Sequence, residues 1–404
     1  HPYPSLLDPN KLKDINEELN YHSIDANLAW ELNLPLPDNY EFIGLFLHAN
    51  GETALSRFLI ECGLNLFYVF ENTGRMRYVS IFNFVLEINN RQAIILLDLN
   101  CSEISKFAYL SNCRPLMVLL RDPIDCLKSF LNVRHQLNGY GNIPRFDLNC
   151  KNFYQIQDRI NYVHEKNGYY NPNSLQRFPE INAIKAILEP NHSMIKYMFK
   201  RDEFIQAFKK EKIYYIDMNE ILKQKTYFTL EKLSKKFNFN APDKNNKIFS
   251  QKIYSVLTIL LPVILEVNYK KIYISNRFSS KALPAIKNYF DFTKECENVF
   301  DENIIIFMDN KEYDLLYKNL KLYKEVLNWI SLFLKSLKER IVQEQQKEIK
   351  VCEVLEYFYI NKQEALQFKN ILDYELTHIK EHRPDIIASW KYYEEFERMC
   401  QKIK

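Results

Sequence analysis

The sequence is poor in glycine and tryptophan, and its cysteines form no CxxC pair. It has 404 residues, of which 7 are glycine, 3 are tryptophan and 8 are scattered cysteines. Without paired cysteines the spacing does not indicate a zinc site, and we expect no bound metal. Cys62, Cys113 and Cys126 fall in or beside apolar segments. This predicts reduced core thiols and a cytoplasmic protein.

The chain also lacks a strong excess of charge and a long apolar run. Its net charge is +3, from 54 basic and 51 acidic residues. This small net charge does not indicate the broad basic surface that binding of duplex DNA requires, and we expect no nucleic-acid partner. The longest strongly apolar run, residues 256–267, contains Pro262 and is too short to span a bilayer. The chain begins at His1 and shows no signal peptide, which is compatible with a part of a longer protein.

What the sequence does contain is a series of short apolar runs of strand length. They cover residues 41–47, 65–70, 93–97, 116–120 and 213–216. Continuous apolar runs are typical of strands buried on both faces of a parallel sheet. Residues 75–88 are aromatic and β-prone. The pattern predicts an α/β fold with a parallel sheet flanked by helices.

Changes in composition predict four segments. Residues 1–38 form an N-terminal arm with a helical stretch near 12–19, and residues 39–246 form the α/β core. Within it, the segment 136–191 is rich in glycine, proline and tyrosine. It predicts either loops that bind the acceptor or a surface insertion. Residues 247–350 are expected to form an inserted helical subdomain, with one strand at 303–308 and a long helical pattern at 312–350. Residues 351–404 are expected to form C-terminal helices that return to the donor site.

Residues 115–135 hold the most informative motif. The strand 116–120 ends at Arg121, Asp122 can cap the following helix, and Pro123 suits its first turn. Ser129 then lies two turns into that helix. The junction between a strand and a helix N-terminus favours an anion, and an arginine with a hydroxyl beside it would hold a phosphate. The alternative is a solvated arginine and a serine on the helix surface.

A second strand–loop–helix segment follows the strand 41–47. Its loop contains His48, Asn50, Gly51, Glu52 and Thr53. This layout is typical of loops that bind phosphate through backbone N–H groups.

Asp98 follows the strand 93–97. A carboxylate at the carboxyl end of a strand could accept a proton from a sugar hydroxyl, or it could simply cap a loop. His48 is the alternative candidate for the catalytic base, because an unperturbed imidazole has a pKa near ~6.5, which suits proton transfer.

These motifs resemble the sulfotransferases. Arg-Asp-Pro followed by serine eight residues after the arginine is similar to the segment with which that family binds the 3′-phosphate of its donor nucleotide. The resemblance implies that Arg121 and Ser129 hold this phosphate. The loop 48–53 matches the family's 5′-phosphate loop at Gly51 and Thr53, but Ala49 stands where the family has a lysine.

Two later stretches extend the resemblance. Residues 215–218 are similar to a family string in which the tyrosine lies near the adenine, so Tyr215 is a candidate for contact with the base. Arg383, with Trp390 and Lys391 seven and eight residues later, keeps the spacing of a late family segment. Arg383 is therefore implied as a second guanidinium on the 3′-phosphate. The resemblance implies a sulfotransferase-like fold, a fold that is similar to that of the P-loop proteins.

The opening residues 1–9 resemble an uncharacterised family encoded in capsule gene clusters of microaerophilic gut bacteria. Some of its members are labelled sugar or methyl phosphoramidate transferases. This implies a transferase that moves O-methyl phosphoramidate or sulfuryl from a 3′-phosphonucleotide donor to a hydroxyl of a capsular polysaccharide. The donor would be a 3′-phospho-CDP-phosphoramidate or the sulfotransferase donor PAPS. The protein would act in the cytoplasm, with the inner membrane and its capsule assembly machinery as a further location.

Three other functions stay open at the sequence level. The first is a PAPS-dependent sulfotransferase, and the second is a nucleotide-sugar glycosyltransferase of capsule biosynthesis. The absence of a convincing Asp-x-Asp next to a strand counts against the glycosyltransferase. The third is a non-enzymatic capsule assembly factor that kept the fold and lost the loop lysine.

Overall fold

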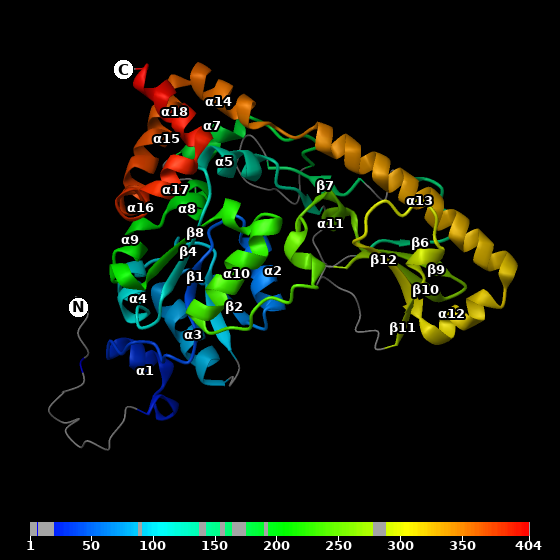
Figure 1. The fold of residues 1–404 in the computed structure, drawn as a ribbon, viewed down its shortest axis with the longest axis horizontal. Helices are drawn as coiled ribbons and strands as arrows, with labels where there is room; N and C mark the ends of the chain where they lie inside the picture. Colours follow the sequence, from blue (N-terminus) through cyan, green and yellow to red (C-terminus); the bar gives the residue numbers. More distant parts are fainter. Residues whose placement is uncertain are drawn as a thin grey trace. The chain divides into compact units, whose positions relative to one another are not determined.

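The computed structural model divides the chain into two compact units (Figure 1). Unit 1 comprises His1–Phe130, Ile184–Lys252 and Val351–Lys404, and unit 2 comprises Leu131–Ala183 and Ile253–Lys350. The structure describes residues 6, 20–87, 91–136, 143–153, 158–163, 175–189, 193–277 and 288–403. The opening motif, the expected helix near 12–19 and part of the expected acceptor loops, including Tyr140, Tyr154, Tyr169 and Tyr170, lie outside these ranges.

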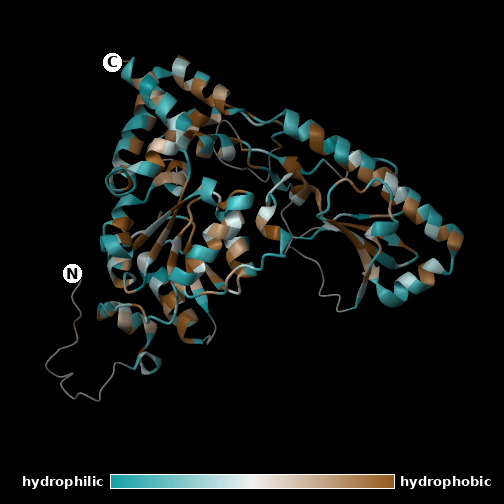
Figure 2. Cartoon of the chain, viewed as in Figure 1, coloured by the Kyte–Doolittle hydropathy of each residue, from teal (hydrophilic) through white to brown (hydrophobic). Residues whose placement is uncertain are grey.

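Unit 1 is built on a five-stranded sheet in the order β2-β3-β1-β4-β8, and all of its neighbouring strands are parallel. The strands are β1 (Ile43–Leu45), β2 (Asn65–Val69), β3 (Gln92–Leu96), β4 (Leu116–Leu120) and β8 (Ile213–Asp217). Every residue of β1, β3 and β4 is buried, which matches their apolar runs. Apolar residues are concentrated on these strands in Figure 2. The predicted α/β fold with a parallel sheet is confirmed.

Helices flank this sheet. Those of the amino-terminal part are η1 (Tyr21–Ser23), α1 (Ala26–Glu31), α2 (Glu52–Glu61), α3 (Gly74–Glu87), α4 (Ile104–Leu110) and α5 (Pro123–Leu131). The middle segment adds α7 (Ala183–Leu188), α8 (Ser193–Phe199), α9 (Asp202–Ile205), η2 (Lys210–Lys212), η3 (Met218–Ile221), α10 (Gln224–Phe237) and η4 (Lys247–Ser250). The end of the chain is helical, as expected, with α14 (Val351–Ile360), α15 (Lys362–Glu375), α16 (Thr377–His382), α17 (Pro384–Ser389) and α18 (Lys391–Gln401).

The expectation of β structure at residues 75–88 is wrong, because the described part of this segment, residues 75–87, belongs to helix α3. Its buried side chains include Tyr78, Ile81, Phe82 and Val85, which recur at the spacing of one helix face. Aromatic and β-branched residues fit a strand, but β-propensity depends on context. Here the helical spacing of the apolar residues determines the secondary structure, since a helix places these four side chains together against the core.

Unit 2 has a sheet of its own, in the order β11-β12-β10-β9-β6. Its strands are β6 (Arg145–Phe146), β9 (Val263–Val267), β10 (Lys270–Asn276), β11 (Tyr289–Asp291) and β12 (Ile304–Asp309). The pair β6–β9 is parallel and the other pairs are antiparallel. The remaining elements are β5 (His135–Gln136), β7 (Ile160–Asn161), α11 (Val256–Leu260), η5 (Thr293–Glu295), α12 (Asn310–Tyr317) and α13 (Leu320–Gln346).

The inserted segment is therefore not a helical subdomain, which corrects the expectation for residues 247–350. The short runs at 263–267 and 304–309 are rich in isoleucine and valine and form strands, whereas the long period of 320–346 forms one helix. The segment expected to supply acceptor loops also belongs to this unit in part, since Ile160 and Tyr162 pack in the same core as Ile272 and Trp329.

In the described ranges, no helix is long and apolar enough to cross a membrane.

Candidate functional site

The strand order creates a natural binding position at the carboxyl ends of β1 and β4. These strands are neighbours, but the chain leaves β1 toward β2 on one side of the sheet and leaves β4 toward β8 on the other side. In open α/β sheets, ligands bind in the crevice outside the carboxyl ends of the strands at such a switch point. The loops that follow β1 and β4 carry residues that the sequence analysis expects to bind an anion.

The loop after β1 is tightly bent. Ala49 has a φ of 62° and Gly51 a φ of 105°, both in the left-handed region. A Cβ on Gly51 would lie 2.1 Å from Sδ of Met218, so backbone angle and space both require glycine here. Gly51 is the N-cap of α2 and has no side chain with which to cap the helix. The first backbone N–H groups of α2 can therefore donate hydrogen bonds to an anion.

Asn50 fixes this loop from the inside. Its side chain is fully buried, and Nδ2 donates to the carbonyl oxygens of His48 at 3.0 Å and Met198 at 3.1 Å. Since both acceptors face Nδ2, Asn50 acts as a brace between the loop and α8. Glu52 accepts a hydrogen bond from Thr53 Oγ1 at 2.5 Å, at the start of α2.

The loop after β4 brings Arg121 against the loop after β1. Nη1 of Arg121 donates to the carbonyl oxygen of Ala49 at 2.9 Å. Nε of Arg121 donates to Asp125 Oδ2 at 2.7 Å, and Lys128 Nζ lies 2.8 Å from Asp125 Oδ1. Ser129 follows Lys128 on α5 and is half-buried. Two cations thus flank one carboxylate, with Arg121 just before α5 and Lys128 within it.

The two cations of this cluster both act on the carboxylate of Asp125. Burial acts to raise the pKa of Asp125, but the charges of Arg121 and Lys128 outweigh it and hold that pKa below its usual range. The side chain of Arg121 is 16% exposed. Its guanidinium has more N–H donors than the contacts with Asp125 and Ala49 use, so it can still bind a phosphate oxygen.

Asp122 links α5 to the end of the chain. It is buried, and its Oδ2 accepts from the backbone N–H groups of Tyr392 at 3.0 Å and Tyr393 at 3.2 Å. Burial raises the pKa of Asp122, although these backbone hydrogen bonds act against the shift. The residue expected only as a helix cap therefore also holds the first turn of α18.

Tyr215 and Arg383 lie together, whereas the resemblance implied contact of Tyr215 with the base and of Arg383 with the 3′-phosphate. Arg383 Nη1 donates to the carbonyl oxygen of Tyr215 at 3.2 Å, while its Nε and Nη2 bind the carboxylate of Asp385. The Tyr215 hydroxyl is hydrogen-bonded to Nδ1 of His378, and burial raises the pKa of this phenol. Tyr215 is 5% exposed, so most of its ring is packed in the interior.

Asp98 is held by an arginine that the sequence analysis did not single out. Arg77 of α3 is 1% exposed; its Nη2 lies 2.8 Å from Asp98 Oδ1 and its Nη1 donates to the Asp98 carbonyl at 2.6 Å. Its Nε donates to the carbonyl of Glu71 at 2.8 Å. The backbone N–H of Asn100 also donates to Asp98 Oδ1, at 2.9 Å. Asp98 thus has a structural role in joining the ends of β2 and β3.

His48, the other candidate base, is half-buried at the start of the loop after β1. Its ring packs edge-on against Tyr197 of α8, with ring centroids 5.9 Å apart. Its backbone N–H donates to the Tyr197 carbonyl at 3.2 Å. The backbone and the ring of His48 are therefore both anchored on α8.

The structure joins the predicted residues in two groups: Arg121 with the loop 48–53, and Tyr215 with Arg383. The sequence analysis missed Arg77, Asp125 and Lys128 as partners. Asp125 and Lys128 were recognisable in part, because they lie four and seven residues after Arg121 on the polar side of the predicted helix. Arg77 was hidden by the incorrect expectation of a strand. Within the described ranges, no group of three or more metal-ligating side chains is gathered.

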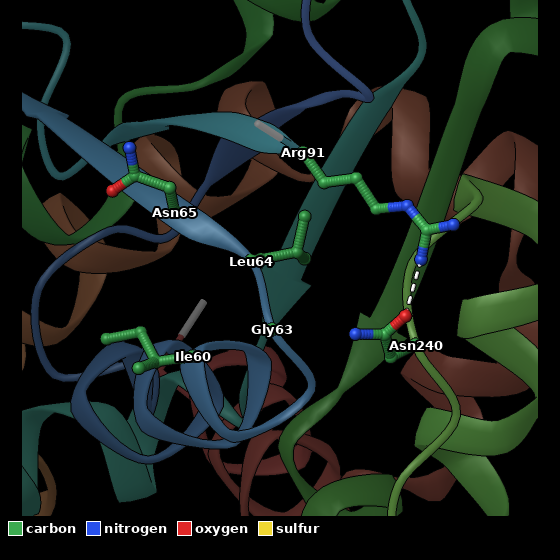
Figure 3. A pocket seen from close by; sticks show the side chains of 6 residues that line it. All are labelled: Ile60, Gly63, Leu64, Asn65, Arg91 and Asn240. Carbon is green, nitrogen blue, oxygen red and sulfur yellow. Dashed lines mark hydrogen bonds between the residues drawn. The ribbon is translucent and has the colours of Figure 1, made fainter. Parts of the chain in front are cut away.

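A shallow pocket of about 520 Å³ lies elsewhere in unit 1 (Figure 3). It is lined by Ile60, Gly63, Leu64, Asn65, Arg91 and Asn240. Nη1 of Arg91 points across it to Oδ1 of Asn240, at 2.5 Å. Asn65 begins β2 and Arg91 precedes β3, so this pocket lies at the amino ends of the strands, opposite the candidate site.

A family model matches the later part of the chain. Residues 215–403 are similar to a family described as protein of unknown function DUF2972. The matched part includes Tyr215, Arg383 and Trp390 and excludes the loop 48–53 and Arg121. No curated protein and no solved structure matches the chain.

Proposed function

We propose that unit 1 binds a 3′-phosphonucleotide and transfers a small anionic group, O-methyl phosphoramidate or sulfuryl, to a hydroxyl of a capsular saccharide. The observation that carries this proposal is the contact of Arg121 with Ala49 at the switch point of the sheet. It sets a guanidinium with spare donors beside the loop that leads into an uncapped helix N-terminus. That combination suits the phosphates of a nucleotide.

Two cations near the loop support a phosphorylated ligand. Ala49 leaves the loop without the lysine of the sulfotransferase pattern, and Arg121 and Lys128 supply cations nearby. Asp125 offsets only one of them and competes with a bound phosphate for Arg121. When a ligand binds, N–H donors of Arg121 would therefore move from Asp125 to the phosphate, and no further side chain would be needed.

Transfer would depend mainly on positioning and charge stabilisation, because phosphoryl-type transfer needs little covalent help from the protein. Backbone N–H groups from Gly51 to Thr53 would bind the donor diphosphate, and Arg121 and Ser129 its 3′-phosphate. Tyr215 would contact the base of the donor, and Arg383 would contact its 3′-phosphate. The contacts of Asp98 with Arg77 favour His48 as the base that accepts the proton of the sugar hydroxyl.

Equilibrium binding of adenosine 3′,5′-bisphosphate and its cytidine analogue tests the proposal. Both should bind to the full chain, and Arg121→Ala should weaken binding by about 1.5–3 kcal/mol, the range for a charge-assisted contact. The control is Arg398→Ala, which removes an exposed arginine paired with Glu394 on α18 and should leave affinity unchanged. If neither bisphosphate binds while a nucleotide sugar does, the function of a nucleotide-sugar glycosyltransferase replaces this proposal.

A turnover assay separates the two candidate bases. His48→Gln should leave bisphosphate binding intact and abolish most of the rate, whereas Asp98→Asn should act chiefly on stability. The reverse result, with Asp98→Asn inactive, fully folded and able to bind, would assign the base to Asp98.

A further inference from the structure

The outer face of α10 has an unusual composition for an exposed helix. The helix buries Thr226, Leu230, Leu233, Ser234 and Phe237. The opposite stripe carries Lys225, Phe228, Lys232, Lys235 and Lys236, at helical spacing. This stripe, together with Leu222 just before the helix, is called the α10 surface below.

Two apolar side chains of the α10 surface stand in solvent. Phe228 is 67% exposed and Leu222 is 44% exposed. Phe228 also lines an open depression of about 490 Å³ together with Tyr214, Glu231 and the three lysines at 232, 235 and 236. Exposing a large apolar ring costs free energy that burial against a partner would recover. An exposed aromatic residue that borders such a depression is a candidate for contact with another surface.

Lysines surround these apolar tips. Helix α10 holds four lysines and one acidic residue, Glu231, and Lys223 precedes it. The whole chain has a net charge of only +3, so positive charge is concentrated on this helix. The ammonium of Lys236 lies 4.6 Å from the ring centroid of Tyr214, which keeps this charge at the depression.

The combination favours a membrane surface over other anionic partners. Basic residues beside a few apolar tips are the pattern of helices that lie in the membrane interface: the lysines approach anionic headgroups while the apolar side chains enter the acyl boundary. An acidic polysaccharide would pair with the lysines but would leave Phe228 in water. A partner groove for an amphipathic helix would need a continuous apolar stripe, whereas apolar and basic residues are mixed here.

We propose that the α10 surface docks the protein on a membrane that contains anionic phospholipids. The proposal is independent of the transferase function, because it rests on α10 and not on the loops after β1 and β4. Docking is peripheral and reversible, and Phe228 and Leu222 supply the apolar contact.

Vesicle co-sedimentation of the full chain tests this. The probe is phosphatidylcholine vesicles with about 40% phosphatidylglycerol, and neutral phosphatidylcholine vesicles are compared at the same salt concentration. We expect binding to the anionic vesicles only, weakening as salt rises. The triple variant Lys232→Glu, Lys235→Glu, Lys236→Glu should lose on the order of 100-fold in affinity or more. Phe228→Ser should lose binding while keeping the charge.

The matched control reverses three exposed lysines of unit 2, with Lys318→Glu, Lys321→Glu and Lys324→Glu. It makes the same change in net charge and should keep most of the vesicle binding. Equal losses in the two triple variants would overturn the proposal, since binding would then follow net charge alone. Binding of wild type to acidic polysaccharide but not to vesicles would overturn it too. Circular dichroism of each variant checks that the fold is retained.

Discussion

The indole Nε1 of Trp390 donates a hydrogen bond to Oδ2 of Asp217 at 2.6 Å, across 173 residues of sequence. Both side chains are buried, with Trp390 1% and Asp217 4% exposed. Asp217 ends β8 and caps η3, whose Met218 lies against Gly51. The contact therefore ties the C-terminal helices to the same strand ends that carry the candidate site.

Trp390→Phe should keep most of the apolar packing but leave Asp217 with one donor fewer. We expect a loss of about 1–3 kcal/mol in the free energy of unfolding, because a buried acceptor is left less satisfied. Urea denaturation measures it. In an Asp217→Asn background the same substitution should cost less, since contacting residues couple. An equal loss of unfolding free energy in both backgrounds would show that the hydrogen bond between Trp390 and Asp217 contributes nothing beyond the packing of the ring.

Arg77→Met should destabilise the protein by about 3 kcal/mol or more, because it leaves the carboxylate of Asp98 without its cation and the carbonyl of Glu71 without a donor. Urea denaturation is again the measurement. Arg75→Met, two residues away, removes an exposed ion pair with Glu31 and should cost less than about 1 kcal/mol. Similar costs for the two variants would contradict the joining role of Arg77.

Gly51→Ala should cost about 1–3 kcal/mol from the left-handed backbone alone, with a further cost from the clash with Met218. Removing the clash in a Gly51→Ala, Met218→Ala double variant should recover only the steric part. Comparison with Met218→Ala alone isolates the backbone part, measured by thermal or urea unfolding. Full recovery in the double variant would mean that the positive φ carries no strain.

Asp125 should contribute stability that depends on pH. Its pKa is depressed in the folded state, so the contribution is fully present above the pKa of about 3.9 that an unfolded aspartate has. It is lost as pH falls through the lower folded pKa. The stability difference between wild type and Asp125→Asn should be largest near neutral pH and shrink in acid. Urea denaturation over a pH series measures it, and a constant difference would contradict the ion-pair cluster.

The same variant, Asp125→Asn, should bind the bisphosphate more tightly, by several-fold. The neutral amide would carry no charge to repel the phosphate or to hold Arg121 by an ion pair. Isothermal calorimetry compares the variant with wild type. If affinity falls instead, Asp125 orients Arg121 for the ligand rather than competing with it.

The sequence alone was sufficient for the central architecture of unit 1. The apolar runs near 93–97, 116–120 and 213–216 became β3, β4 and β8 within one residue, because a strand buried on both faces must be apolar along its whole length. The junction at Arg121, Asp122 and Pro123 was likewise readable, because capping and proline placement are local. The long helical period of unit 2 was also local and became α12 and α13.

Only the tertiary structure decided which residues meet. Strand order set β1 beside β4 and so placed Arg121 on Ala49, and long-range packing paired Arg77 with Asp98 and Trp390 with Asp217. It also turned the aromatic segment 75–88 into a helix and gave unit 2 its sheet. Local patterns fix the period and ends of an element, whereas a side chain's partner depends on contacts between segments far apart in the chain.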